Sequence, residues 1–152
     1  QRAQMPIIEL YDYHIYDANK DYTKASLQGQ KALRFAEYEI SYETIVTTKS
    51  DKNAKSIAYI YGEEVRRVGD EYIFDKGGVY AKDSGESFWS KRGVYDLKKG
   101  IFRGIGEFWA VSLSGDFEGE NIIYKQKEGT MAAENIKAKI YLDKDFDKNK
   151  HN

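Results

Sequence analysis

The stretch that decides the fold is residues 93–111, GVYDLKKGIFRGIGEFWAV, because a similar pattern returns in residues 121–140, NIIYKQKEGTMAAENIKAKI. Each copy has a tyrosine, a charged tetrapeptide, a glycine and then small and large residues in alternation. Tyr95 and Gly100 recur as Tyr124 and Gly129 at the same spacing. Such self-similarity between short alternating segments predicts hairpins that stack on their neighbours.

Two glycines interrupt the strand expected over residues 101–113. One face of that strand carries Phe102, Gly104, Gly106, Phe108 and Ala110. The opposite face carries Ile101, Arg103, Ile105, Glu107, Trp109 and Val111. A glycine inside a strand marks a bulge, a bend or the close approach of another group. A bend is the favoured interpretation here, and it is compatible with a gap that contacts a ligand.

Period-2 alternation continues from residue 7 to residue 142, so the chain is predicted to be all-β. The segment 31–42, KALRFAEYEISY, has helix-favouring residues, but its alternation and the β-branched run after it predict a strand. Further strands are expected over 22–27, 57–61, 65–68, 71–74, 79–81, 88–95, 117–124 and 131–142, with polar turns at 17–21 and 50–53. The spacing alone also suits a sandwich or an up-and-down barrel.

A chain of 152 residues favours one domain with a substantial core. We expect residues 1–142 to form it and residues 143–152, DKDFDKNKHN, to be a charged, disordered tail.

The composition excludes several classes of function. The 24 basic and 25 acidic residues balance, so no nucleic acid or anionic membrane is expected as a general partner. The absence of cysteine excludes disulfides, thiol catalysis and thiolate metal sites. No run of about 18 to 20 apolar residues could span a bilayer, and the N-terminus lacks a signal-peptide core. The chain is therefore expected to be cytosolic or to follow an upstream anchor or signal.

No catalytic or cofactor site is predicted. His14 and His151 are too few for a metal set without a further ligand. The aspartates at 143, 145 and 147 resemble the start of a calcium loop, but Lys148 stands where glycine is required. The glycines lack the strand-to-helix context of a phosphate loop, and no serine lies in a nucleophile elbow. We expect a protein that is not an enzyme and has no cofactor and no metal.

The succession of turn glycines, aromatic residues and alternating apolar residues resembles the periplasmic domain of LptC and the wider LptA/LptC, OstA-like family. The residues that carry the resemblance are Gly93, Val94, Tyr95, Asp96, Gly100, Phe102, Gly104, Gly106, Phe108, Ser114, Gly115, Phe117, Ile122, Tyr124, Gly129, Met131, Ile136 and Ile140. The opening residues Pro6–Leu10 with Tyr13, and Ala25, Ser26 and Leu27, also fit.

The resemblance implies an open, twisted β jelly roll of stacked antiparallel strands that binds lipopolysaccharide in an apolar groove. It implies transfer of that lipid from an LptB2FG-type ABC transporter to an LptA-like bridge protein. It also implies a periplasmic location, with an inner-membrane anchor formed by an N-terminal transmembrane helix absent from this chain. In an open sheet, a homodimer can also form by edge-strand pairing.

The predicted lipid-binding interior follows from the more apolar parity of each strand. It comprises Tyr38, Ile40, Tyr42, Phe102, Gly104, Gly106, Phe108, Phe117, Ile122, Ile136 and Ile140. The predicted partner edge strands carry Ile7, Ile8, Leu10, Ala132, Ile136, Ala138 and Ile140. The alternatives are a closed lipocalin-like barrel for a small hydrophobic ligand and a structural repeat protein with no ligand.

Overall fold

The computed structural model describes residues 5–18, 23–49 and 56–142. These residues form ten β-strands and no helix. The strands are β1 (Ile8–Ala18), β2 (Thr23–Arg34), β3 (Glu39–Lys49), β4 (Ile57–Val68), β5 (Glu71–Phe74), β6 (Gly78–Lys82), β7 (Ser87–Asp96), β8 (Ile101–Val111), β9 (Gly115–Lys125) and β10 (Thr130–Ile140). The expected turn at 50–53, most of the turn at 17–21 and the tail at 143–152 lie outside the described residues.

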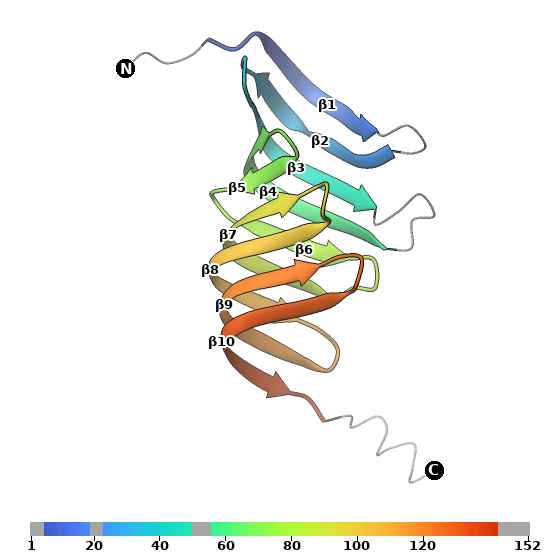
Figure 1. The fold of residues 1–152 in the computed structure, drawn as a ribbon, viewed down its shortest axis with the longest axis vertical. Helices are drawn as coiled ribbons and strands as arrows, with labels where there is room; N and C mark the ends of the chain where they lie inside the picture. The colour runs from blue at the N-terminus through green and yellow to red at the C-terminus, as the bar shows by residue number, and fades with distance from the viewer. Residues whose placement is uncertain (1–4, 19–22, 50–55, 143–152) are drawn as a thin grey trace.

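The strands form one antiparallel sheet in which each strand follows its predecessor (Figure 1). β5 and β6 occupy the same position in the strand order, because both pair with β4 on one side and β7 on the other. The two short strands therefore act as a single strand that is broken at Asp75–Gly77.

The sheet does not close on itself. β1 and β10 stand at the two ends of the strand order and do not pair with each other. Figure 1 shows them at opposite ends of an elongated molecule. The all-β, open, stacked antiparallel architecture expected from the sequence is thus confirmed, and the closed lipocalin-like barrel is excluded.

A row of residues with positive φ bends the strands near their middles. It comprises Asp12 of β1, Glu43 of β3, Gly106 of β8, Asn121 of β9 and Asn135 of β10. Aspartate and asparagine tolerate this left-handed conformation better than most residues, and glycine adopts it freely. On β3 the bend shifts the alternation by one, and the buried side chains are Ser41, Thr44, Val46 and Thr48. Both halves of the strand therefore face the same interior.

Side-chain hydrogen bonds connect the bends of adjacent strands. The Gly106 backbone N–H donates to Asn121 Oδ1 at 2.9 Å, and Asn121 Nδ2 donates to Glu134 Oε2 at 2.8 Å. Asn135 Nδ2 donates to Glu120 Oε1 at 2.7 Å. The register of β9 and β10 shifts here, as expected at a bulge. The bend at Gly106 of β8 is therefore matched by bends at Asn121 of β9 and Asn135 of β10.

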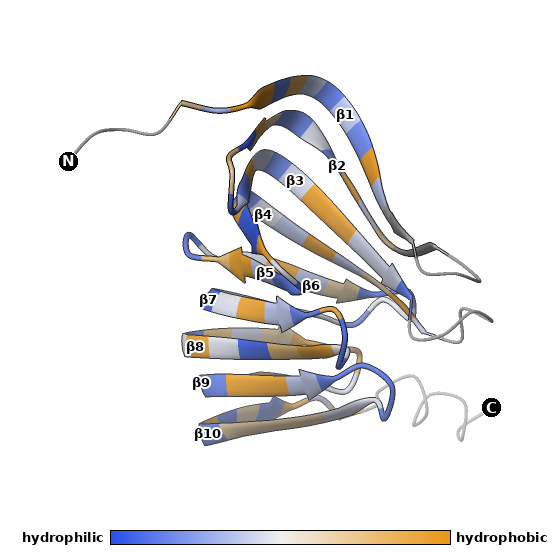
Figure 2. Ribbon diagram, turned by 45° about the horizontal axis from the view of Figure 1, so that its top comes forward, coloured by the Kyte–Doolittle hydropathy of each residue, from blue (hydrophilic) through white to orange (hydrophobic). Residues whose placement is uncertain are grey.

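Aromatic rings fill the centre of the interior. The Tyr80 ring stacks on Phe88 with centroids 5.0 Å apart and meets Tyr124 edge-on at 5.0 Å, and Phe88 meets Phe102 at 5.3 Å. The Tyr80 hydroxyl has no hydrogen-bond partner among the described residues. Burial raises the pKa of Tyr80 well above its usual value. Figure 2 shows the alternation of apolar and polar residues along the strands that produces this core.

Buried Gln126 joins distant parts of the chain. Its Oε1 accepts hydrogen bonds from Thr48 Oγ1 at 3.0 Å and from Tyr95 Oη at 2.6 Å. Its Nε2 donates to the Ser56 carbonyl at 3.2 Å. The residue after β9 is thereby fixed to the region where β3 ends and β4 begins.

Two strand predictions are wrong in detail. The segment 31–42 is not one strand, because β2 ends at Arg34, a turn closed by the Phe35 N–H and the Tyr38 carbonyl follows, and β3 begins at Glu39. The strands expected at 57–61 and 65–68 are the single strand β4. At 35–38 the chain turns without a glycine or proline, whereas at Gly62 the alternation of β4 shifts but the strand continues.

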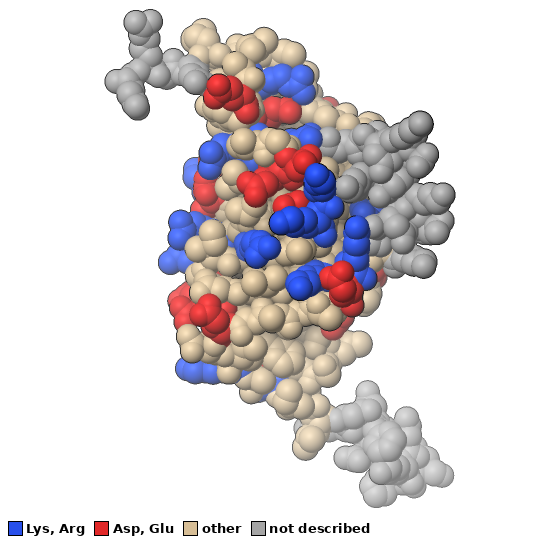
Figure 3. Space-filling view, viewed as in Figure 1, with Lys and Arg blue, Asp and Glu red and all other residues tan. Residues whose placement is uncertain are grey.

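No helix in the described residues is long and apolar enough to span a membrane. Nor do these residues gather three or more His, Asp or Glu side chains that could hold a metal ion. Acidic and basic side chains lie interspersed on the face shown in Figure 3.

Candidate lipid-binding groove and edge strands

A groove opens into the interior near the C-terminal end of the sheet. Its volume is about 270 Å³. The apolar part of its lining is Phe88, Ala110, Val111, Phe117, Tyr124 and Met131. The groove lies where the β6–β7 turn faces the end of β9 and the start of β10.

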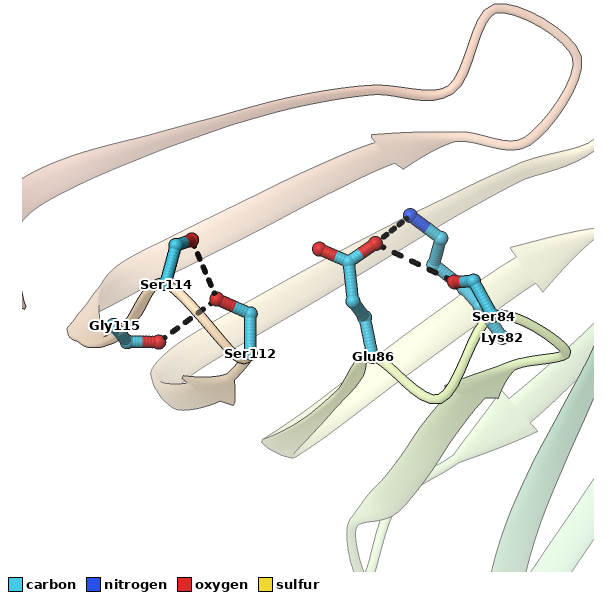
Figure 4. Close-up of polar contacts among 6 residues, drawn as sticks. All are labelled: Lys82, Ser84, Glu86, Ser112, Ser114 and Gly115. Carbon is cyan, nitrogen blue, oxygen red and sulfur yellow. Dashed lines mark hydrogen bonds and ion pairs between the residues drawn. The ribbon is translucent and has the colours of Figure 1, made fainter. Parts of the chain in front are cut away.

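Polar side chains from two neighbouring turns form the rim of this groove (Figure 4). In the β6–β7 turn, Lys82 Nζ lies 2.8 Å from Glu86 Oε1, and Ser84 Oγ donates to the same oxygen at 3.4 Å. In the β8–β9 turn, Ser112 Oγ donates to the Gly115 carbonyl at 3.0 Å and lies 3.1 Å from Ser114 Oγ. The rim is therefore hydrophilic, whereas the floor is apolar.

Both members of the ion pair in the rim are charged at neutral pH. Desolvation opposes the charge of Lys82, but the hydrogen bond to Glu86 and the nearby Tyr124 favour it, and the pKa of Lys82 is raised. The hydrogen bond from Lys82 lowers the pKa of Glu86. Lys82 Nζ also lies 5.3 Å from the centroid of the Tyr124 ring, so the ammonium group covers an edge of the apolar floor.

Beyond the groove, β10 leaves part of the inner face uncovered. Ala138 pairs with Phe117, which packs against the core, so Ala138 and its same-parity neighbours Ile136 and Ile140 face inward. Ile136 is nevertheless 51% exposed and Ile140 64% exposed. Met131, which pairs with the buried Tyr124, is 43% exposed. No strand follows β10 in the described sheet, so these apolar side chains contact solvent.

The structure brings one part of the predicted interior together. Phe102, Phe108 and Ile122 are fully buried in the central core, and Phe117 is half-buried beside the groove. Gly104 is also buried, as expected from the alternation on β8.

Glycine is required at the two β8 positions for different reasons. A Cβ at Gly104 would lie 2.6 Å from Ile122 Cγ2 and 2.7 Å from Ser90 Oγ, so the core packs directly against the backbone. Gly106 has φ 84°, and a Cβ there would meet nothing closer than Lys91 Cδ at 3.6 Å. Gly106 is therefore a bend, and Gly104 is a close approach by protein side chains.

Three other predicted interior residues do not join this core. Tyr38 lies in the β2–β3 turn, where its ring stacks on Phe35 with centroids 4.7 Å apart. Ile40 and Tyr42 flank buried Ser41 on β3, so they point to the opposite face of the sheet. The expectation of one shared interior is wrong for Tyr38 because it lies in a turn, and for Ile40 and Tyr42 because the bend at Glu43 shifts the alternation of β3.

The predicted edge residues lie on the two end strands. Ile7, Ile8 and Leu10 are exposed at the start of the chain, on or just before β1. On β10, Ile136, Ala138 and Ile140 share the inner parity, whereas Ala132 pairs with Ile123 on the opposite parity. Each end strand has one backbone edge with no neighbouring strand in the described sheet.

Sequence reasoning missed several residues that shape the groove. Phe88, Ala110 and Tyr124 line it but were not among the predicted site residues. Their inward parity is visible in the alternation of β7, β8 and β9, and could have indicated them. Gln126 has no such signal, because a glutamine after a strand is most simply a surface residue.

The chain matches no protein-family model and is not significantly similar to any curated protein. Among solved structures it is similar to LptH of Pseudomonas aeruginosa, described as the LptA-homologous periplasmic component of a lipopolysaccharide transport device. The identity is 15%, the alignment covers 90% of this chain and 96% of LptH, and the TM-score is 0.43.

Proposed function

We propose that this chain is a non-enzymatic lipid-binding module that takes up acyl chains of lipopolysaccharide and passes them to a partner protein. The observation that carries the proposal is the uncovered inner face of β10, which continues from the apolar groove beside Phe117 and Met131. Apolar side chains of this kind, placed at the open end of a core, are normally covered by a ligand or a partner. The resemblance of the sequence to the LptA/LptC family supports lipopolysaccharide as the lipid.

The size of the groove sets what it holds. A volume of about 270 Å³ is slightly below the usual range for small-molecule sites, so it accommodates part of one acyl chain at a time. Each methylene group removed from water contributes about 0.8 kcal/mol. Further passage toward the centre requires the rings of Tyr80, Phe88 and Phe102 to move, because they are packed against one another.

Lipid would enter and leave the module through partner proteins that bind the two end strands, β1 and β10. An exposed strand edge binds another strand through main-chain hydrogen bonds. β10 would add to an LptA-like bridge protein, and β1 to the periplasmic part of an LptB2FG-type ABC transporter. The inner parity of β10, with Ile136, Ala138 and Ile140, would then continue into the partner as one apolar surface.

Site-specific photo-crosslinking tests the binding of lipid to the inner face. We would place a photoreactive amino acid at Phe117 and at Ile136, on the inner parity, and at the outward-facing Arg103 and Glu107 of β8 as controls. We expect lipopolysaccharide to be captured at the two inner positions at least about tenfold more than at the two outer ones. Equal capture at inner and outer positions would show that the groove does not bind the lipid.

A further inference from the structure

A second hollow lies on the outer face of the sheet, over the ends of β8, β9 and β10. Its volume is about 500 Å³. The outward-facing side chains that line it are Trp109, Val111, Asp116, Glu118, Lys137 and Lys139. They occur in two cross-strand rows, in which Trp109 pairs with Glu118 and Glu118 with Lys137, and Val111 pairs with Asp116 and Asp116 with Lys139. Ala110, Phe117 and Ala138, which alternate with these residues along the strands, also line the hollow between the two rows.

Trp109 offers a fixed aromatic surface in this hollow. Its side chain is 56% exposed, although tryptophan is a costly residue to leave in water. Its ring lies against half-buried Trp89 of β7, with centroids 5.1 Å apart and planes inclined at 39°. The contact holds the indole in place before any ligand arrives, so little side-chain entropy is lost on binding.

The charges around Trp109 balance. Asp116 and Glu118 contribute two carboxylates, and Lys137 and Lys139 contribute two ammonium groups. Within the described part of the chain, no ion pair joins these carboxylates to these lysines. A phosphate would meet two carboxylates here and a cation would meet two ammonium groups, so the hollow favours a neutral ligand with many hydrogen-bonding groups.

Asp116 gives a second reason to expect a ligand that donates hydrogen bonds. Its Oδ2 accepts a hydrogen bond from the Tyr141 hydroxyl, which fixes the carboxylate in position. Its Oδ1 is screened from solvent and has no donor among the described residues. A buried carboxylate oxygen without a donor is unfavourable, and a ligand hydroxyl that displaces the groups covering this oxygen would supply the donor.

We propose that this outer hollow is a binding site for a neutral pyranose oligosaccharide. The C–H groups on one face of a pyranose carry slight positive charge and pack against the electron-rich face of Trp109. The sugar hydroxyls donate to Asp116 and Glu118 and accept from Lys137 and Lys139. The two side-chain rows face away from the lipid groove, although Ala110, Val111 and Phe117 line both hollows. The binding of a saccharide does not depend on the function proposed for that groove.

Isothermal titration calorimetry with maltohexaose, cellohexaose and chitohexaose tests this site on the full chain. We expect at least one of them to bind with a dissociation constant of about 1 mM or tighter. Trp109→Ala should weaken that binding at least about tenfold and Asp116→Asn about threefold or more. Tyr59→Ala removes another exposed outer-face aromatic residue, outside the hollow, and should leave binding unchanged. Melting temperatures of all variants show whether the fold is retained.

A second arm identifies the source of the sugar. Vesicles of phosphatidylcholine with and without digalactosyl diacylglycerol show whether a glycolipid headgroup binds through Trp109. Binding in either arm that is lost in Trp109→Ala supports the site. The proposal is overturned if no saccharide or glycolipid binds, or if Trp109→Ala binds as well as the unmodified chain. It is also overturned if sedimentation shows a dimer that Trp109→Ala dissociates, because a second copy would then occupy the hollow.

Discussion

The centre of the sheet and its C-terminal end use the same local design but differ in burial. β8 and β10 each have eleven residues, a residue with positive φ near the middle and an inner parity rich in apolar side chains. Phe102 and Phe108 on β8 are fully buried, whereas Ile136 and Ile140 on β10 are more than half exposed. β8 has a strand on each side and β10 has one neighbour. Burial in this architecture therefore depends on position in the stack as much as on residue type.

This difference predicts that removing a large side chain lowers the free energy of unfolding much more on β8 than on β10. Phe102→Ala should lower the free energy of unfolding by about 4 kcal/mol, because it leaves a cavity among Phe74, Tyr80 and Phe88. Ile140→Ala should change it by less than about 0.5 kcal/mol. Urea unfolding curves measure both values. A loss above about 2 kcal/mol for Ile140→Ala would mean that the end of the sheet is covered in solution.

Alkaline pH should weaken the centre of the sheet. Burial raises the pKa of Tyr95 from 10.0 to about 12. Because the folded-state pKa lies above the unfolded value, the stabilisation is complete below pH 10 and is lost as the pH rises toward 12. The loss should reach about 3 kcal/mol, and buried Tyr80 shifts stability in the same direction.

The urea midpoint measured from pH 8 to pH 12 checks this prediction. Tyr95→Phe is the control, because it keeps the ring but removes the titrating hydroxyl. It should be less stable than the unmodified chain at pH 8, where it loses the hydrogen bond to Gln126, but should depend less on pH. An unchanged midpoint of the unmodified chain between pH 10 and 12 would contradict the assignment of Tyr95 to the buried centre.

Substitutions of the two β8 glycines separate the cost of a steric clash, at Gly104, from the cost of a left-handed backbone, at Gly106. Gly104→Ala should cost about 2 kcal/mol, because the new Cβ overlaps Ile122 and Ser90. Gly106→Ala should cost about 1 kcal/mol, since only its left-handed backbone is unfavourable for alanine. Gly106→Asn should recover part of that loss, as Asn121 and Asn135 occupy the equivalent bends of β9 and β10. If Gly106→Asn were worse than Gly106→Ala, space around the bend would matter more than its φ angle.

The sequence predicts strand identity and order well, because alternation and turn residues are local signals. β7 to β10 lie within a few residues of the expected segments, and the inner parity of β8 is confirmed. The errors occur where a bend shifts the alternation without a glycine, as at Glu43, which placed Ile40 and Tyr42 on the wrong face. The outer hollow at Trp109 was not predicted, because it depends on which residues of β9 and β10 stand beside the tryptophan. That register is a property of the assembled sheet.

The position of Gln126 has a consequence for how the molecule folds. A stack in which strands pair only with their neighbours can assemble and fray one hairpin at a time, with little cooperativity between its ends. Gln126 departs from that pattern, since its side chain bonds Thr48 and Ser56, which lie 78 and 70 positions earlier in the chain. Closing so long a loop costs entropy, so these bonds form after the local hairpins. Together with the contact between Tyr80 of β6 and Tyr124 of β9, these bonds couple the two halves of the stack, so that loss of one half destabilises the other.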